Sequence, residues 1–260
     1  MEVRMDGRNA VITGGSAGLG KAMAREFVAS GANVAIVARR QDVLDQAKSE
    51  IEKAGSGKII AISADIRQAD ECTRAFNEAV QAFGQVDILI NNAGTSRRGP
   101  FMDITDEVWQ EDFDLKVFSA IRFARLAIPG MRERNWGRII NVLNSGAKTP
   151  PAEGAPTAVS RAAGMAIMKV LANENAKYNV MVNSLHVGKI RSEQWEKRHE
   201  KDERGLTLDQ WYDEEGKSQP MGRLGTPEEF AAIACLLCSD RGSYITGAAI
   251  NVDGGLSNAV

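Results

Sequence analysis

The sequence predicts an α/β protein built around a doubly wound parallel sheet. Short apolar runs alternate with helical patterns along the whole chain, as in sheets with helices on both faces. The first run, residues 10–12, leads directly into a glycine-rich turn and a helix. Polar or glycine-containing turns follow most of the other runs, and the carboxyl ends of parallel strands meet at one sheet edge. The sequence therefore predicts one ligand site at that edge.

The expected elements follow from hydrophobic periodicity and from turn residues. Strands are expected at residues 10–12, 34–38, 58–63, 86–90, 137–142, 180–185 and 248–252. Helices are expected from residue 22, at 41–54, 69–83, 109–131 and 157–178, and from residue 226. The fourth range is expected to be one long helix, with an early end at Pro129 as the alternative. Thr226 fits the N-cap of the last helix and Pro227 its first position. Residues 189–220 are charged and are expected to be irregular.

Composition indicates a cytoplasmic protein with one domain, residues 1–260. The chain has 43% hydrophobic and 25% charged residues, and its formal net charge of −2 gives no electrostatic case for nucleic acid or an anionic membrane. No apolar run approaches the ~20 residues that span a bilayer. Residues 1–8 lack the apolar centre of a signal peptide.

Cysteine and histidine usage gives no metal site. Cys235 and Cys238 have the spacing of a redox or zinc motif, but they lie in an apolar helical run without a second pair. We therefore expect them, like Cys72, to be core residues. His186 and His199 are the only histidines, so a histidine-based metal centre is not expected.

The turn from Thr13 to Gly20 is the first candidate binding element. Its sequence, Thr-Gly-Gly-Ser-Ala-Gly-Leu-Gly, lies between an apolar strand and a helix start. Glycines allow the backbone to approach a ligand, and a helix N-terminus offers unpaired N–H groups to a pyrophosphate. The alternative is a tight strand-to-helix turn without a ligand.

The end of the second strand indicates which dinucleotide would bind. Arg39 and Arg40 follow Ala38, about 20 residues beyond the glycines, where dinucleotide folds recognise the adenosine ribose. An acid there would bind the 2′-hydroxyl, whereas arginine binds a 2′-phosphate through several donors. The pattern favours NADP(H) over NAD(H). Two arginines that are only solvated at a strand end remain the alternative.

In its motifs and their order the chain resembles the short-chain dehydrogenases/reductases, from about Gly7 to Leu256. The motifs are Thr13-Gly14-x-x-x-Gly18-x-Gly20, Asp65-Ile66, Asn91-Asn92-Ala93-Gly94, Gly137-Arg138-Ile139-Ile140-Asn141-Val142, Val182-Asn183, Pro227-Glu228-Glu229 and Val252-Asp253-Gly254-Gly255. The resemblance implies a single Rossmann-type domain with about seven parallel strands, a dimer or tetramer, and a substrate-capping segment at about residues 189–220.

The resemblance also implies the cofactor contacts. The pyrophosphate would lie on the glycine turn, and the 2′-phosphate on Arg39 with Arg40. Other contacts would come from the strand ends that follow. The residues implied are Gly14, Ser16, Ala17, Gly18, Leu19, Gly20, Arg39, Arg40, Asp65, Ile66, Asn92, Ala93, Gly94, Arg161, Gly188 and Ile190.

The catalytic positions of the family depart from its pattern. Members normally use Asn, Ser, Tyr and Lys, and here these positions fall on Asp114, Asn144, Thr157 and Arg161, with Ser145 beside the second. Arg161 could keep the cationic role toward the nicotinamide ribose. Thr157 is a far weaker acid than tyrosine, while Asn144 or Ser145 could still bond a carbonyl. The usual proton donor is therefore missing.

Other residues could supply the proton. His186 and Lys189 flank the expected nicotinamide position, although the sequence favours packing for His186 and solvation for Lys189. Tyr212 lies in the capping segment, while Tyr178 is expected to be a packing residue. Without any donor, loss of general acid catalysis costs roughly 10²–10⁴-fold, so slow hydride transfer with water as the acid remains an option.

Two functions therefore stay open. One is an NADP(H)-dependent oxidoreductase with an atypical proton relay, acting on a small carbonyl, alcohol or activated alkene. The other is a non-catalytic NADP(H)-binding sensor, scaffold or subunit. The substrate is not identified. A homodimer or homotetramer is expected, with helices 109–131 and 157–178 as contact faces.

Overall fold

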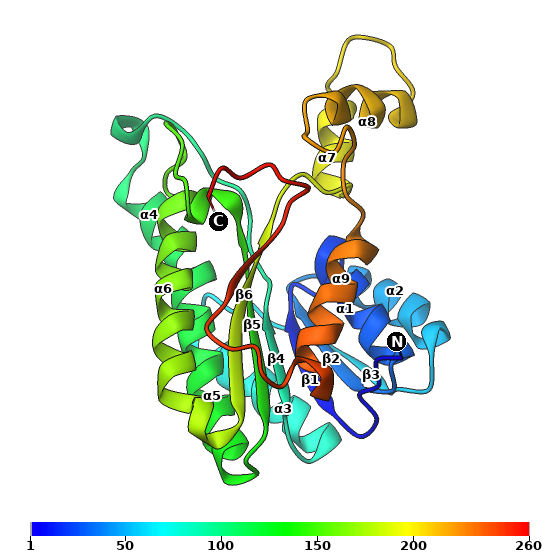
Figure 1. Ribbon diagram of the computed structural model, residues 1–260, viewed down its shortest axis with the longest axis vertical. Helices are drawn as coiled ribbons and strands as arrows, with labels where there is room; N and C mark the ends of the chain where they lie inside the picture. Colours follow the sequence, from blue (N-terminus) through cyan, green and yellow to red (C-terminus); the bar gives the residue numbers. More distant parts are fainter. Residues whose placement is uncertain (1, 260) are drawn as a thin grey trace.

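Seven parallel strands form one sheet in the order β3-β2-β1-β4-β5-β6-β7, in a computed structural model that describes residues 2–259 (Figure 1). The strands are β1 (Asn9–Thr13), β2 (Asn33–Ala38), β3 (Ile59–Ser63), β4 (Ile88–Asn91), β5 (Gly137–Asn144), β6 (Val180–Val187) and β7 (Ala249–Val252). The order reverses between β1 and β4, which is where doubly wound sheets bind ligands. The predicted fold class, a Rossmann-type doubly wound parallel sheet, is confirmed.

Helices cover both faces of this sheet (Figure 1). On one face lie α1 (Gly18–Ala29), α2 (Gln41–Ile51) and α9 (Pro227–Cys238). On the other lie α3 (Ala69–Phe83), α5 (Ser119–Glu133) and α6 (Thr157–Asn175). Successive strand residues point to opposite faces, so the apolar runs of β1 and β2 supply both layers of core.

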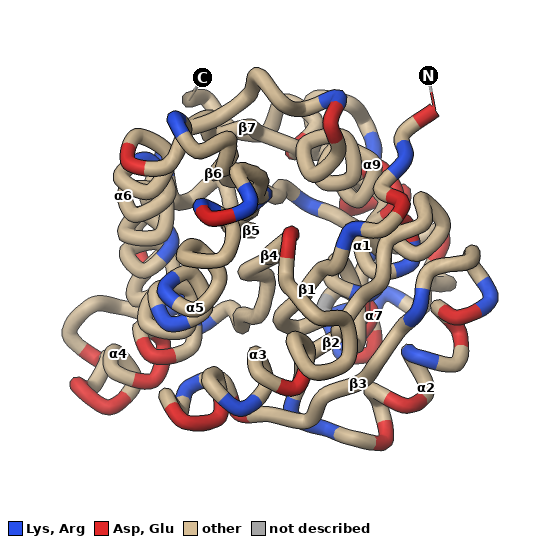
Figure 2. Tube along the Cα trace, turned by 90° about the horizontal axis from the view of Figure 1, so that it is seen from below, with Lys and Arg blue, Asp and Glu red and all other residues tan. Residues whose placement is uncertain are grey.

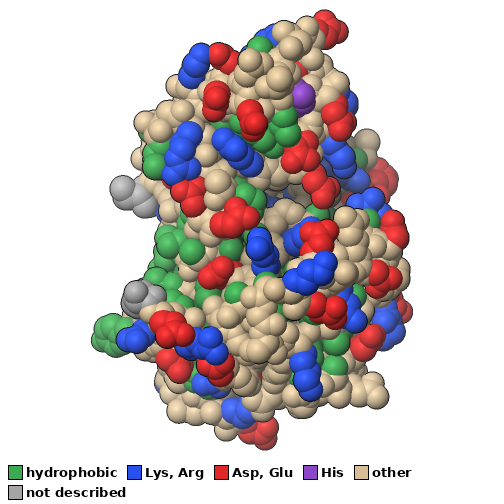
Figure 3. All heavy atoms as spheres, turned by 90° about the vertical axis from the view of Figure 1, so that its right-hand side faces the viewer, with side chains coloured by type: hydrophobic (Ala, Val, Ile, Leu, Met, Phe, Trp, Pro, Cys, Tyr) green, Lys and Arg blue, Asp and Glu red, His purple; other side chains and the backbone are tan. Residues whose placement is uncertain are grey.

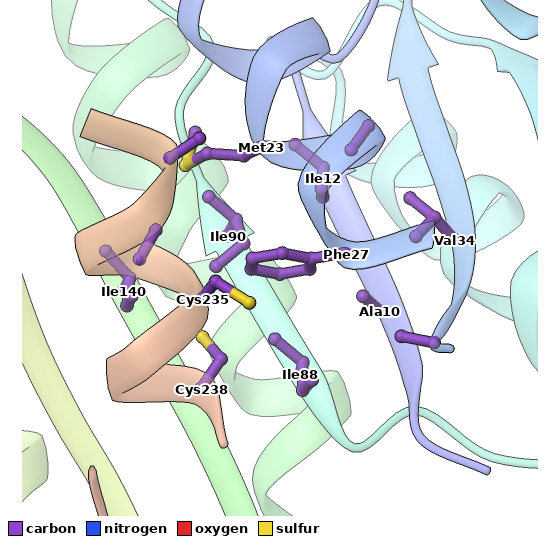
Figure 4. Close-up of a cluster of buried hydrophobic side chains, with 14 of the residues drawn as sticks. Ala10, Ile12, Met23, Phe27, Val34, Ile88, Ile90, Ile140, Cys235 and Cys238 are labelled. Atoms are coloured by element: carbon purple, nitrogen blue, oxygen red, sulfur yellow. The ribbon is translucent and has the colours of Figure 1, made fainter. Parts of the chain in front are cut away.

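Phe27 of α1 lies at the centre of the first core layer, between α9 and the sheet (Figure 4). Cys235 and Cys238 of α9 lie in the same cluster, and both are free thiols. Burial raises the pKa of Cys235 to about 11, so this thiol stays protonated. The interpretation of the Cys-x-x-Cys spacing as core packing agrees with this placement.

The long helix expected at residues 109–131 is longer and is interrupted differently. Helix α4 (Asp106–Phe113) continues through a π-helical segment, η3 (Asp114–Phe118), into α5. Pro129 lies inside α5, so the alternative in which it ends the helix early does not hold. The apolar face of α5 is buried on the sheet beyond Pro129, and this packing outweighs one lost backbone hydrogen bond.

The segment expected to be irregular at residues 189–220 contains two helices, α7 (Glu193–His199) and α8 (Leu208–Lys217). They project from the body of the molecule (Figure 1). A small apolar cluster of their own, formed by Trp211, Tyr212 and Leu224 with Trp195, Leu206 and Leu208, holds them together. Tertiary burial of these aromatics, rather than helical periodicity, organises the segment.

The start of α9 follows the sequence prediction. The Thr226 hydroxyl accepts from the Glu229 N–H at 3.3 Å, and the Glu229 carboxylate accepts from the Thr226 N–H at 2.8 Å. Pro227 occupies the first turn. This capping box satisfies two backbone donors that the helix leaves free.

Charges of both signs are mixed along the outer helices (Figure 2). Among residues 2–259, no helix combines the length and apolar character that a bilayer crossing requires. The same residues include no group of three His, Cys, Asp or Glu side chains placed to hold a metal ion.

Candidate functional site

The glycine turn leaves the start of α1 open. Gly14 takes a left-handed conformation, with φ of +67°, directly after β1. The N-cap residue of α1 is Ala17, which is extended and has no side chain that could accept from the first turn. The first N–H groups of α1 are therefore available to an anionic ligand, and a Cβ placed on Gly18 would meet nothing within 4 Å.

Side chains tie this turn to the end of β4. The Thr13 hydroxyl oxygen accepts from the backbone N–H groups of Asn92 at 3.0 Å and Ala93 at 3.1 Å. The Asn92 amide donates to the carbonyls of Thr13 and Gly14, at 3.0 and 3.1 Å. A Cβ on Gly20 would lie 2.1 Å from the Gly14 oxygen. The missing side chain of Gly20 thus leaves room for the Gly14 carbonyl, and the Asn92 amide holds the turn in place.

Two adjoining cavities follow the carboxyl edge of the sheet. The outer cavity, about 200 Å³, is lined by Gly14, Ser16, Val37, Ala38, Arg39, Arg40, Ala64, Asp65, Ile66, Ala93, Gly94, Thr95 and Leu115. The inner cavity, about 350 Å³, is lined by Gly14, Ala17, Gly18, Leu19, Asn92, Ala93, Gly94, Val142, Arg161, Val187, Gly188, Ile190, Ser192, Glu193 and Trp195. Every predicted cofactor residue except Gly20 lines one of them.

The rim of the outer cavity carries more positive than negative charge. Arg39 and Arg40 are exposed at the end of β2. Arg67, which the sequence analysis did not single out, binds the Asp65 carboxylate through Nε at 2.9 Å and a terminal nitrogen at 2.5 Å. This guanidinium holds the pKa of Asp65 below its usual range. Asp65 is therefore engaged within the protein, while Arg39 has no ion-pair partner among the described residues.

Thr157, the first residue of α6, lies in a buried polar network. Its hydroxyl oxygen accepts from the Lys116 ammonium at 2.9 Å and from the Arg97 N–H at 3.0 Å. Lys116 also pairs with Asp112, whose second oxygen accepts from the Ser160 hydroxyl at 2.6 Å. The side chains of Lys116 and Asp112 are 2% and 0% exposed. The network thus brings a cation into contact with the threonine that the sequence analysis assigned to the tyrosine position.

Burial, and then the Arg161 guanidinium, lower the pKa of Lys116 to about 8. Burial lowers the pKa of Arg161 to about 10, which leaves it charged near neutrality. The Arg161 guanidinium donates to the Val142 carbonyl, and its Nε is buried without a partner in the described part of the chain. A lysine with a pKa near 8 can exchange protons at working pH.

Sequence reasoning missed Lys116 and Asp112, although their i, i+4 spacing is that of a helical ion pair. It pointed instead to Asp114. The carboxylate of Asp114 accepts from Gln110 at 2.9 Å and lies 3.5 Å from Arg122, outside the Thr157 network. The π-helical segment that holds both Asp114 and Lys116 has a geometry that recurs at functional sites.

Asn144 and Ser145 lie where β5 ends. The Asn144 side-chain oxygen is buried and has no partner among residues 2–259. Ser145 begins the short turn η4 (Ser145–Ala147), where its carbonyl accepts from the Lys148 N–H at 3.1 Å. Neither residue lines the inner cavity, whereas Arg161 does. Of the four predicted catalytic residues, only Arg161 therefore lines one of the two cavities.

The alternative proton sources lie elsewhere. Tyr212 is buried in the capping segment, and burial raises the pKa of its hydroxyl. It lines a third cavity, about 710 Å³, between α1 and the capping segment, where charges of both signs surround the hollow (Figure 3). Lys189 Nζ lies 3.3 Å from the Ser218 hydroxyl and outside the inner cavity. His186 is buried beside Asn144.

Known proteins resemble this chain over almost its full length. A family model described as enoyl-(acyl carrier protein) reductase matches residues 14–257. D-beta-hydroxybutyrate dehydrogenase of Cupriavidus necator is 34% identical over 257 residues, which are 96% of this chain and 98% of that protein. These matches support a nicotinamide-dependent oxidoreductase.

Solved structures agree with the sequence relatives. The L-sorbose reductase of Gluconobacter frateurii, solved with NADPH and L-sorbose, has a TM-score of 0.94 at 33% identity, with all of both chains covered. A short-chain oxidoreductase of Pseudomonas aeruginosa PAO1, described as containing an atypical catalytic center, has a TM-score of 0.91 at 34% identity. That comparison covers 97% of this chain and 98% of the other.

Proposed function

The chain belongs to the short-chain dehydrogenase/reductase family, and from this premise we propose that it is an NADP(H)-dependent oxidoreductase acting on a small carbonyl compound, alcohol or activated alkene. One observation carries the proposal. The two adjoining cavities lead from Arg39 and Arg40, past the open N-terminus of α1, to Arg161. Each part of that path has the chemistry that a phosphorylated dinucleotide needs.

The residues present fit the cofactor. The α1 N-terminus lacks a side-chain cap and opens toward the inner cavity at Gly18, which suits a pyrophosphate. Arg39 and Arg40 suit the 2′-phosphate. Arg161 lines the inner cavity, and its buried Nε has no partner among residues 2–259, which suits the nicotinamide ribose. The cofactor, when bound, supplies or accepts the hydride.

Lys116 and Thr157 are proposed to form the proton relay. The Thr157 hydroxyl oxygen accepts from Lys116 and from the Arg97 N–H, so its own proton remains free for a third group. Thr157 would pass this proton to the substrate oxygen while it takes one from Lys116. Threonine need not ionise in such a transfer, and the lysine pKa near 8 suits it. Asn144 would bond the substrate oxygen.

A non-catalytic NADP(H)-binding protein is the second candidate, and one observation favours it. Thr157 is only 2% exposed and does not line the inner cavity. In that function Lys116 and Thr157 would only hold the start of α6. Both candidates require NADP(H) binding and differ in turnover.

The test begins with calorimetric titration of NADPH and NADH into the wild type and Arg39→Ala. Loss of charge-assisted hydrogen bonds should weaken NADPH binding about 10- to 100-fold and leave NADH binding unchanged. Arg74→Ala, an exposed arginine on α3, is the matched control. Stopped-flow NADPH oxidation with ketones, aldehydes and enals then separates the two candidates. If Arg39→Ala binds NADPH as tightly as the wild type and Arg74→Ala do, the cofactor assignment is contradicted.

We also propose a homodimer or homotetramer. Phe118, Val159 and Val170 are 41%, 43% and 56% exposed on the outer faces of η3 and α6. Burial of these apolar side chains against a second copy would favour association. Sedimentation that finds only monomer at micromolar concentration would contradict this proposal.

A further inference from the structure

His186 on β6 lies beside the end of β5, where the predicted substrate-binding residue Asn144 is located. Its side chain is 0% exposed. Nδ1 lies 3.2 Å from the backbone oxygen of Asn144, and Nε2 lies 3.0 Å from the hydroxyl oxygen of Ser184. Ser184 and His186 are two residues apart on one strand, so both side chains point to the same face of the sheet. Both ring nitrogens are therefore engaged.

These partners define the tautomer of a neutral ring. A backbone carbonyl can only accept, so Nδ1 must carry the hydrogen that bonds the Asn144 oxygen. In the neutral ring Nε2 is then unprotonated and accepts from the Ser184 hydroxyl. The Ser184 hydroxyl proton therefore bonds Nε2, the ring nitrogen that the Asn144 carbonyl does not contact.

The surroundings keep the ring neutral. Burial, then the positive charges of Lys148 and Arg161, lower the pKa of His186 to about 4. The bond to Asn144 and the charge of Asp253 raise the pKa, but by less than the other effects lower it. Near neutral pH, His186 therefore carries no proton that it could give to a substrate. It acts as a fixed hydrogen-bond donor.

We propose that His186 is the positioning residue for Asn144, an inference that rests on the proposed oxidoreductase function. The side-chain oxygen of Asn144 has no partner among the described residues. No bond to that oxygen holds the amide in place, so its direction follows from the backbone at Asn144. Asn144 is paired with Val187 in the β5–β6 ladder, and the His186 bond adds a side-chain anchor to the same backbone where β5 gives way to η4.

A purely space-filling histidine would behave differently. If the ring only fills volume between β6 and η4, an apolar residue of similar size should preserve the site. If the Nδ1–H bond matters, a side chain that keeps a donor at that position should be sufficient. Asparagine meets this condition, because its amide nitrogen occupies the place of Nδ1. Leucine does not.

The tautomer can be measured without any activity. The chain contains two histidines, and Nε2 of His199 lies 2.8 Å from the Leu206 backbone oxygen. His199 must therefore donate from Nε2, whereas His186 donates from Nδ1. Long-range ¹⁵N–¹H spectra of histidine-labelled protein should show one ring of each tautomer, and His186→Asn removes the Nδ1–H signals. An Nε2–H tautomer at His186 would overturn the proposal.

Kinetics then test the positioning. A shift of about 1 Å at a reacting group costs up to about 100-fold, so His186→Leu should lower kcat about 10- to 100-fold with an unchanged NADPH Kd. His186→Asn should stay within about threefold of the wild type. Wild-type kcat in His186→Leu, or equal losses in the two variants, would contradict the proposal.

The side-chain amide signal of Asn144 separates failure of the positioning role from failure of the proposed function. If the wild type turns over no substrate, the proposed function fails, and the side-chain amide signal of Asn144 becomes the readout. That signal, assigned with Asn144→Asp, should shift in His186→Leu and keep its position in His186→Asn. An unchanged signal in His186→Leu would show that His186 does not orient Asn144.

Discussion

The ammonium nitrogen of Lys116 lies 2.9 Å from the hydroxyl oxygen of Thr157, although the two residues are 41 positions apart in the chain. The contact is buried, and Asp112 compensates the charge of the lysine. It joins η3 to the first turn of α6 at the threonine that the sequence analysis assigned to the family's tyrosine position.

Removal of Lys116 should abolish the relay without loss of the cofactor. Lys116→Met alone would leave Asp112 as an unpaired buried charge, so the test variant combines it with Asp112→Asn. Turnover by this variant should fall about 10²- to 10⁴-fold, the usual contribution of general acid catalysis. NADPH affinity, measured by calorimetry, should not change. Lys177→Met, an exposed lysine in η5 (Ala176–Tyr178), is the control. Wild-type turnover in the double variant would exclude Lys116 as the proton source.

The pH dependence should follow the pKa of Lys116, which is about 8. Reduction requires the protonated lysine, so its rate should be level below about pH 7 and fall about tenfold per unit well above the pKa. Oxidation requires the unprotonated amine, so its rate should rise through the same range. Stopped-flow rates at saturating substrate and cofactor give both profiles. An inflection that persists in Lys116→Met/Asp112→Asn belongs to another group.

The hydroxyl of Thr157 should matter more than its shape. Thr157→Val keeps the volume but leaves Lys116 and the Arg97 N–H without their acceptor, at a cost of about 1–3 kcal/mol in unfolding free energy. Its turnover should fall as far as that of the lysine variant, whereas Thr157→Ser should keep most of it. Thr157→Tyr should not gain activity, because a ring at a 2% exposed position overpacks the site. Equal turnover by Thr157→Val and Thr157→Ser would contradict the proton relay.

The glycine turn should not tolerate a side chain at Gly20. A Cβ there would lie 2.1 Å from the Gly14 oxygen, so Gly20→Ala must shift the turn or the start of α1. Overpacking of this kind typically costs about 1–3 kcal/mol in unfolding free energy. NADPH binding should weaken as well, because the α1 N–H groups move. Gly99→Ala, where a Cβ meets nothing within 4 Å, is the control for denaturation and calorimetry. If Gly20→Ala and Gly99→Ala have the same unfolding free energy and the same NADPH affinity, the turn is not rigid.

Sequence by itself determined the features that depend on neighbouring residues. The glycine turn, the arginines after β2 and the Thr226 N-cap are local patterns, since each needs only a few consecutive residues to form. The alternation of strands and helices likewise predicted the sheet, because it dictates which faces must be buried.

Only the tertiary structure decided which side chains meet. Lys116 reads from sequence as one more solvated lysine, and only the packing of η3 against α6 places it on Thr157. For His186 the sequence favoured packing over catalysis, and only the structure identifies the Asn144 carbonyl as its partner. The helices of the capping segment form because their aromatics bury one another. Local sequence restricts backbone conformation, whereas contacts between distant residues depend on burial that no short stretch of sequence encodes.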